Sequence, residues 1–277
     1  MQAALIGLVF SGFVGLVFGD LVRVLLGVKS AFASAAVAAD PERRAAMARV
    51  FGGLAVAFGL VGGAFGVAGA RGKPRVVRVR VPIARLPAGL EGTTIAQISD
   101  VHVGPTIGRE MLGRVVDRLN ELGPDLVAIT GDLVDGGKPE EYAFLRSLLA
   151  PLSMPLYLVP GNHDARDAMR AAFPEHAYLP PRGFLQYAVE GLPVRLLALD
   201  TLVDGRGHGE MCAERLGWLE ARLAESDRPT LLFMHHPPFD CGISFFDGHK
   251  LNAGAGRLAE IVRRHPQVER VVCGHVH

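Results

Sequence analysis

Cysteine is scarce in this chain, with three among 277 residues, at Cys212, Cys241 and Cys273. Their number is odd, and their spacing matches neither a CxxC pair nor a zinc ribbon, which disfavours a disulfide framework. So few thiols are more typical of a reducing compartment.

A dominant charge is also missing, because 29 Lys and Arg residues balance 28 Asp and Glu residues. This balance gives no electrostatic reason to expect a nucleic-acid partner. One basic run, "RGKPRVVRVR" at 71–80, follows an apolar stretch directly, which is more typical of a membrane boundary. No basic stripe with interleaved aromatic residues is present, so a nuclease is not favoured.

Charged residues are absent from two long apolar runs, 1–19 and 50–70. Each run approaches the roughly 20 residues that a helix needs to cross a hydrocarbon core of about 30 Å. Small residues recur at every fourth position, a spacing that lets membrane helices pack closely. We therefore expect a membrane anchor over residues 1–72, with transmembrane helices at about 3–19 and 50–70.

Two alternatives to this anchor remain open. The first run could be a signal peptide with "AFASAA" as its cleavage region, but it lacks a basic n-region. The second run could be a flexible segment, since glycine weakens helices in water. Lys and Arg flank the second run on both sides, so they do not set its orientation. The two apolar runs together predict a multi-pass protein of the cell membrane. Because thiols are few, we expect the remaining domain, 73–277, to be cytoplasmic.

Short apolar runs alternate with helical patterns after Arg75. The segment "VVRVRVPIARLPAG" (76–89) alternates and ends in Pro and Gly, as an entry strand would. Six further runs are predicted strands: "TIAQIS" (94–99), "LVAIT" (126–130), "LYLVP" (156–160), "VRLLALD" (194–200), "TLLFM" (230–234) and "RVVC" (270–273). Leucine and valine at helical spacing predict helices over 112–122, 216–223 and 258–262. Strands that alternate with helices indicate an α/β layered domain.

Polar residues directly follow five of these strands. In chain order they are Asp100 and His102, then Asp132, then Asn162, His163 and Asp164, then His235 and His236, and finally His275 and His277. In open α/β sheets the carboxyl ends of the strands line the crevice where ligands bind. Carboxylate, imidazole and amide oxygen together suit divalent ions such as Mn, Fe or Zn. Each motif alone is weak, but the five in this order predict one metal site.

The motif set D-x-H, GD, GNH-D, H and GH-x-H resembles that of the calcineurin-like metallophosphoesterase superfamily over roughly residues 85–277. The resemblance implies a four-layer α-β-β-α sandwich, in which two β-sheets pack face to face under helices. It also implies two divalent metal ions, which would be Mn, Fe or Zn. By matching position, the first metal would be held by Asp100, His102 and His277, the second by Asn162, His235 and His275, with Asp132 bridging.

The same resemblance implies catalytic roles beside the metals. His163 would donate a proton while a hydroxide shared by the two metals attacks phosphorus. Asp164 would either support His163 or cap its turn, and both readings stay open. His236 is the alternative to His235 as a ligand, and Asp135 is expected to serve a turn.

Two parts of the domain resemble different subfamilies. Residues 80–108, "RVPIARLPAGLEGTTIAQISDVHVGPTIG", are similar to membrane-anchored bacterial phosphoesterases, some of which act on lipid-linked phosphates. From "GDLVDGGKPEEY" (131–142) onward, including "LLFMHHPPFDCGISFFD", the chain is similar to class III cyclic-nucleotide phosphodiesterases.

We therefore expect a phosphodiesterase with a small substrate, in first place a 3′,5′-cyclic nucleotide. Hydrolysis of lipid-linked phosphates, or a non-catalytic membrane-tethered scaffold that retains the metal site, are the alternatives. Family members continue past GH-x-H with further strands, so the domain 73–277 is expected to be truncated at its C-terminus. The sequence predicts no oligomeric state.

Overall fold

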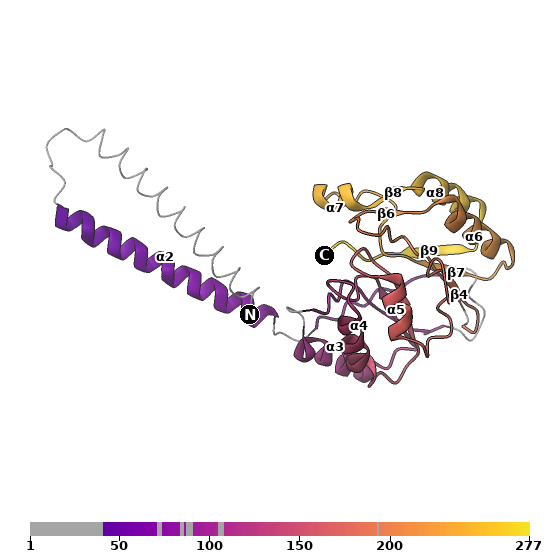
Figure 1. Ribbon diagram of the computed structural model, residues 1–277, viewed down its shortest axis with the longest axis horizontal. Helices are drawn as coiled ribbons and strands as arrows, with labels where there is room; N and C mark the ends of the chain where they lie inside the picture. Colours follow the sequence, from indigo (N-terminus) through magenta and orange to yellow (C-terminus); the bar gives the residue numbers. More distant parts are fainter. Residues whose placement is uncertain (1–40, 71–73, 84–85, 87–90, 105–107, 193) are drawn as a thin grey trace. The chain divides into compact units, whose positions relative to one another are not determined.

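The computed structural model describes residues 41–70, 74–83, 86, 91–104, 108–192 and 194–277. The chain divides into two compact units, Met1–Lys73 and Pro74–His277. Each unit is described below by itself (Figure 1).

The described part of the first unit is one helix, α2 (Pro41–Ala70). Proline suits the first turn of a helix, because its fixed φ is helical and its missing N–H would be unpaired there. The helix therefore begins at Pro41 rather than near residue 50. Its segment Arg49–Gly66, with a mean hydropathy of 1.5, is the one helix of the described residues that is long and apolar enough to cross a membrane. The helix predicted at about 3–19 lies outside the described residues.

The stripe of small residues predicted in α2, Ala55, Gly59 and Gly63, is less exposed than several bulky residues of the helix. Leu54, Phe58 and Phe65 are each at least 60 % exposed. Gly59 is buried and Gly63 is half-buried. This division matches the expected stripe of small residues, and it leaves a broad apolar face uncovered.

The described residues of the second unit form three sheets. The first sheet consists of β1 (Ile95–Ile98), β2 (Leu126–Thr130) and β3 (Leu156–Val159), in that order and all parallel. The second has the order β4 (Tyr187–Val189), β5 (Arg195–Ala198), β7 (Thr230–Phe233), β9 (Val268–Val272), with only β4 antiparallel. The third pairs β6 (Gly209–Glu210) with β8 (Leu251–Ala253). The six runs predicted as strands between residues 94 and 273 are thereby confirmed.

The two larger sheets pack face to face between helices. The helices are α3 (Arg109–Leu122), α4 (Pro139–Leu149), α5 (Arg166–Ala172), α6 (Ala213–Ala224), α7 (Ser244–His249) and α8 (Ala255–Arg264). Leu196 and Leu231 of the second sheet pack into the core of the first sheet, whereas the next residues, Leu197 and Leu232, pack against α6 and α8. Because neighbouring strand residues point to opposite faces, the second sheet lies between the first sheet and these two helices.

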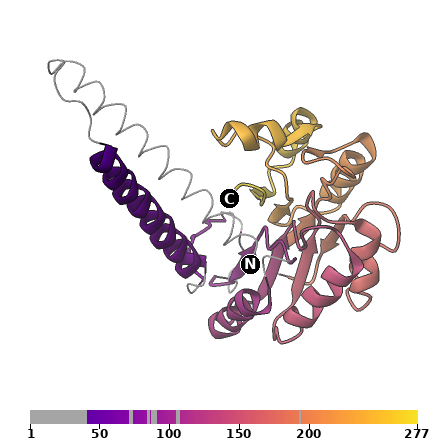
Figure 2. The ribbon, with the colours of Figure 1, turned by 60° about the vertical axis from the view of Figure 1, so that its left-hand side comes forward.

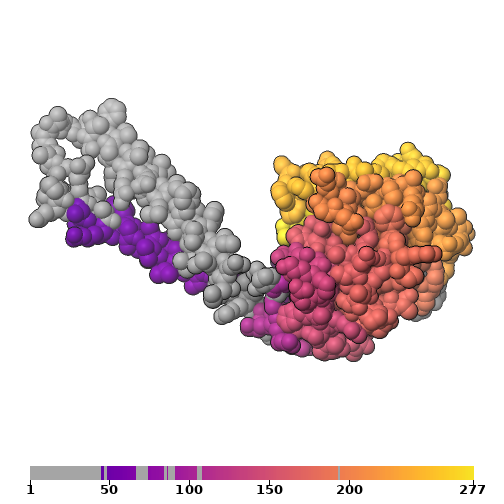
Figure 3. Space-filling view, viewed as in Figure 1, coloured from indigo at the N-terminus to yellow at the C-terminus, as the bar shows by residue number. Residues whose placement is uncertain are grey.

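Figures 1 and 2 show α3, α4 and α5 on one side of this unit and α6 and α8 on the other. In the space-filling view of Figure 3, the magenta and orange-yellow halves of the unit form one continuous surface. The expected α/β layered architecture is therefore confirmed for the second unit.

The predicted entry strand at 76–89 is wrong, because residues 74–83 form no strand. Val77 and Val79 are 68 % and 75 % exposed. A guanidinium N–H of Arg270 donates to the carbonyl of Pro82 at 3.3 Å. The alternation of valine and arginine resembles a half-buried strand, but here the valine side chains are as exposed as the arginines.

Helix α4 fixes the turn that follows β3. The hydroxyl of Tyr142, which is fully buried, donates to Asp164 Oδ1 at 2.8 Å and accepts the Ala165 N–H at 2.8 Å. Asp164 Oδ2 accepts the backbone N–H groups of Gly161 at 2.8 Å and Leu133 at 3.2 Å. These four bonds tie the turns after β2 and β3 to one helix.

Replacement Tyr142→Phe is expected to lower the free energy of unfolding by about 1–3 kcal/mol, because it leaves a buried oxygen and a buried N–H without a partner. Urea denaturation followed by circular dichroism measures the change. The matched control is Tyr157→Phe, on the partly exposed β3, which is expected to change stability by less. Equal effects of the two replacements would contradict the role given to the Tyr142 hydroxyl.

Candidate metal centre

The ends of β1, β2 and β9 are joined by hydrogen bonds. The N–H of Asp100 donates to Gly131 O at 3.1 Å, and the N–H of His102 donates to Asp132 O at 2.9 Å. The N–H of His275 donates to the carboxylate of Asp100 at 2.9 Å. Segments far apart in the sequence therefore meet at one edge of the sheets.

One group of predicted ligands lies around the end of β1. Ligand atoms of Asp100, His102 and His277 lie within 4.8 Å of one another. His102 Nε2 is 3.6 Å from Asp132 Oδ2, and the rings of His102 and His277 are 5.7 Å apart. These are the residues that the sequence assigned to the first metal and its bridge.

The second group surrounds His235. Its Nε2 lies 3.1 Å from Asn162 Oδ1, 3.1 Å from His275 Nδ1 and 3.4 Å from Asp132 Oδ2. Its Nδ1 is 2.9 Å from the carbonyl oxygen of Thr130, which can only accept, so Nδ1 carries a proton. Asp132 thus contacts both groups, and the structure brings all seven predicted ligands together.

His236 is also fully buried, but its ring has a different partner. Its Nδ1 lies 2.8 Å from the hydroxyl of Thr201. A ligand atom of His236 lies within 4.8 Å of those of His235 and His275. His236 therefore borders the second group, while His235 makes the contacts to Asp132 and Asn162.

Backbone strain is concentrated at these residues. Among the described residues, the non-glycine residues with positive φ are Asp100 (54°), His102 (46°), Asp132 (49°) and His275 (73°). Each such conformation costs on the order of 1–3 kcal/mol, and strain of this kind clusters at functional sites. All four residues are predicted metal ligands, so the fold maintains an unfavourable backbone where the site needs it.

Two glycines permit the close approach of these side chains. A Cβ at Gly131 would overlap the ring of His235, and a Cβ at Gly161 would overlap the carboxylate of Asp132. Both glycines directly precede a predicted ligand in the sequence. The lack of a Cβ at these two positions, and not turn type alone, therefore explains why glycine precedes Asp132 and Asn162.

The donor atoms fit divalent cations. Asp100 Oδ1 and His275 Nε2 are buried without a hydrogen-bond partner among the described residues. Buried polar atoms normally find partners, so unpaired ones within a cluster of metal-ligand types fit the binding of a cation. Three ligand types, carboxylate, imidazole and amide oxygen, match the borderline-to-hard metals predicted from the sequence.

Protonation states agree with this fit. Burial, reinforced by the charge of His235, lowers the pKa of His275 to about 4, which keeps its imidazole neutral. Burial alone would raise the pKa of Asp132, but the hydrogen bond and charge of His235 outweigh it and lower that pKa. Burial would lower the pKa of His235, but the hydrogen bond and charge of Asp132 outweigh burial, so the pKa of His235 is raised. A metal would displace the proton from this pair, so its binding weakens in acid.

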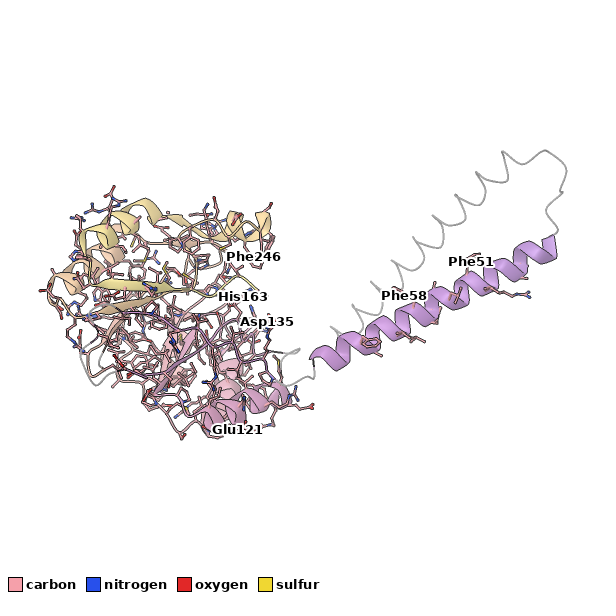
Figure 4. All side chains as sticks on the ribbon, turned by 180° about the vertical axis from the view of Figure 1, so that it is seen from behind. Phe51, Phe58, Glu121, Asp135, His163 and Phe246 are labelled. Atoms are coloured by element: carbon pink, nitrogen blue, oxygen red, sulfur yellow. The ribbon has the colours of Figure 1, made fainter. Side chains whose placement is uncertain are left out.

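His163 stands at the exposed side of the cluster. Its backbone N–H donates to Asp132 Oδ1 at 2.9 Å, and its Nδ1 lies 2.7 Å from the carbonyl of Asp135. Its ring meets that of His102 edge to face at 4.7 Å. Figure 4 labels His163 and Asp135 at the same edge of the unit.

Asp164 lies behind this edge and is buried. Burial raises the pKa of its carboxyl to about 6, and its oxygens accept two backbone N–H groups and the Tyr142 hydroxyl. Of the two alternatives for Asp164, this geometry favours the turn-capping role.

Asp135 is predicted to serve only a turn, yet its side chain borders the cluster. Asp135 Oδ1 lies 3.9 Å from His102 Nδ1 and 3.9 Å from His163 Nδ1. Pairing of Val103 with Val134 brings it there. The spacing of three residues after Asp132 was the available signal, but it did not reveal that the paired turns would run side by side.

Comparison with known proteins agrees with this geometry. A probable glycerophosphodiester phosphodiesterase of Arcobacter nitrofigilis is 35 % identical over 195 residues, covering 66 % of this chain and 71 % of that protein. A 3′,5′-cyclic adenosine monophosphate phosphodiesterase of Escherichia coli K12 is 33 % identical over 202 residues, covering 69 % and 71 %.

A dimetal phosphatase from Danio rerio has a similar fold, with a TM-score of 0.53 at 16 % identity, covering 66 % of this chain and 81 % of that one. The family model described as calcineurin-like phosphoesterase matches residues 93–277. The chain therefore belongs to the calcineurin-like phosphoesterase family.

Proposed function

We propose that this phosphoric ester hydrolase cleaves phosphodiesters on two divalent metal ions, with a 3′,5′-cyclic nucleotide as its leading substrate. The proposed ligands are Asp100, His102 and His277 for the first ion, Asn162, His235 and His275 for the second, and Asp132 between them. The observation that carries the proposal is the convergence of these groups from five strand ends around one carboxylate.

Bound there, two divalent ions supply Lewis acidity that activates water and polarises phosphate oxygens. The chain contributes the orientation of the reacting groups. Asp132 accepts the backbone N–H of His163 and thereby places that histidine beside the ligands. The carbonyl of Asp135 accepts a hydrogen bond from the Nδ1–H of His163, so that in the doubly protonated ring the Nε2–H is the group that gives its proton to the departing oxygen.

Two relatives support two candidate substrates. One is named for cyclic adenosine monophosphate and the other for glycerophosphodiesters, at 33 % and 35 % identity. The resemblance of residues 131–142 and the segments that follow to cyclic-nucleotide phosphodiesterases favours the first. A glycerophosphodiester is the second candidate. Every expected ligand type is present, which disfavours a scaffold without activity.

The full chain, supplied with Mn, is expected to hydrolyse bis-p-nitrophenyl phosphate, and a chelator is expected to abolish that activity. A panel of cyclic AMP, a glycerophosphodiester and a lipid-linked pyrophosphate then ranks the substrates by kcat/KM. We expect cyclic AMP to rank first. A higher value for the glycerophosphodiester would select the second candidate, and hydrolysis of none under any metal would select the scaffold.

Replacement His163→Ala is expected to reduce kcat by about 10²–10⁴-fold, the usual contribution of a positioned acid or base, with metal content unchanged. Replacement Asp132→Ala is expected to lower the metal content as well, because it removes the carboxylate common to both groups. Elemental analysis of the purified variants separates the two outcomes. Wild-type turnover by the His163 variant on several phosphodiesters would refute the proton-donor role.

We further propose that α2, with the apolar run before it, anchors the chain in the cell membrane and leaves the catalytic unit in the cytoplasm. Support comes from the apolar segment Arg49–Gly66 and from the exposed side chains of Leu54, Phe58 and Phe65. A bilayer could cover this apolar face without burying unpaired polar groups, since the helix forms the hydrogen bonds of its own backbone.

The full chain is expected to stay in the membrane pellet after an alkaline carbonate wash, whereas a chain that begins at Pro74 is expected in the supernatant. Protease treatment of sealed, inside-out vesicles is expected to digest the catalytic unit if it is cytoplasmic. Release of the full chain by carbonate would argue against an integral anchor. Protection of the unit in such vesicles would place it on the opposite side.

A further inference from the structure

Over residues 91–277, the segment after β7 exposes more large apolar side chains than any other described segment. Among the described residues of 91–277, the exposed large apolar side chains are Met111, Phe239, Ile243 and Phe245. Three of these four lie within or beside α7, a helix with no buried residue. Residues 239–245 therefore present an apolar surface to solvent.

Phe246 of α7 connects this surface to the metal centre. Its ring meets that of His275 at 5.5 Å with an interplanar angle of 81°, and that of His277 at 5.7 Å and 61°. Phe246 is only half-buried, so part of its ring remains open to a ligand. Figure 4 labels Phe246 along the same edge of the unit as His163 and Asp135.

The polar side chains of this segment are used to hold it together. Asp247 accepts the N–H of Cys241 at 2.6 Å, and His249 Nδ1 lies 2.8 Å from Phe245 O. Lys250 forms an ion pair with Asp240. The side chain of α7 whose ring contacts the predicted ligands His275 and His277 is that of Phe246.

We propose that Phe246 is a specificity-determining residue that stacks against the base of a nucleoside phosphate whose phosphate lies at the metal centre. The inference rests on the proposed function, because it takes a nucleotide as the ligand. A planar base offers a π-face on which the Phe246 ring can stack, whereas a glycerol group offers none. Stacking does not depend on which base is present, since every base has a π-face, so adenine and guanine are expected to bind alike.

Equilibrium binding to the metal-loaded full chain tests this directly. The probes are 5′-AMP, 5′-GMP and ribose 5-phosphate, which shares the sugar and phosphate but lacks the base. The wild-type chain is expected to bind both nucleotides on the order of tenfold more tightly than ribose 5-phosphate. Phe246→Ala and Phe246→Leu are expected to abolish that preference without weakening ribose 5-phosphate, and Phe246→Tyr is expected to retain it.

The matched control is Phe245→Ala. Phe245 is 68 % exposed, and its ring centroid lies 4.6 Å from that of His249 and 5.3 Å from that of Phe246. Its loss therefore disturbs the same helix and the packing of Phe246 without removing the ring beside the predicted ligands. The control is expected to keep the preference for nucleotides. Elemental analysis is expected to find equal metal content in all variants.

Equal binding of nucleotide and ribose 5-phosphate by the wild-type chain would overturn the inference, as would an equal loss for both in Phe246→Ala. The result is separable from the proposed function. A base-dependent affinity that Phe246→Ala removes would support the inference even if cyclic AMP were not hydrolysed. Hydrolysis of cyclic AMP without such a preference would support the function and refute the role of Phe246.

Discussion

The carboxylate of Asp132 is the constraint on which the rest of the site depends. It lies between two histidines of different strands, 3.6 Å from His102 Nε2 and 3.4 Å from His235 Nε2, and it also accepts the backbone N–H of His163. A buried carboxylate without charged partners would bind a proton. Its lowered pKa therefore records how completely the surrounding strand ends are organised around one negative charge.

That organisation is obtained against backbone preference. Four predicted ligands adopt positive φ, which residues bearing a Cβ rarely do. The compensation lies nearby: buried Tyr142 and Asp164 bind the turns from behind, and two glycines leave room for His235 and Asp132. A metal would add to this compensation, because it binds the folded arrangement and not the unfolded chain.

The sequence predicted the residues of the metal centre better than it predicted the helices and turns that position them. Ligand types and strand ends were readable because Asp, Asn and His follow apolar runs directly, and each run became the expected strand. Helices α4 and α5 and strand β4 were not predicted. Helix α5 and strand β4 are short, whereas in α4 the helical spacing of Tyr142, Leu145, Leu148 and Leu149 was an available signal. The entry strand failed because alternation shows a pattern of side chains and not the presence of a neighbouring strand. The role of Asp135 and the ring contacts of Phe246 depend on distant segments meeting, which no local pattern contains.

The contrast between Asp132 and α7 separates two requirements of the enzyme. The predicted ligands are held by buried hydrogen bonds and strained turns, and changes there alter the whole site. Helix α7 has no buried residue and is secured mainly by bonds within its own segment, so its side chains can vary without disturbing the core. Relatives that share the family pattern are named for different phosphodiesters. A rigid phosphate-handling centre beside a lightly anchored aromatic segment is an arrangement in which substrate choice can change while the reaction is retained.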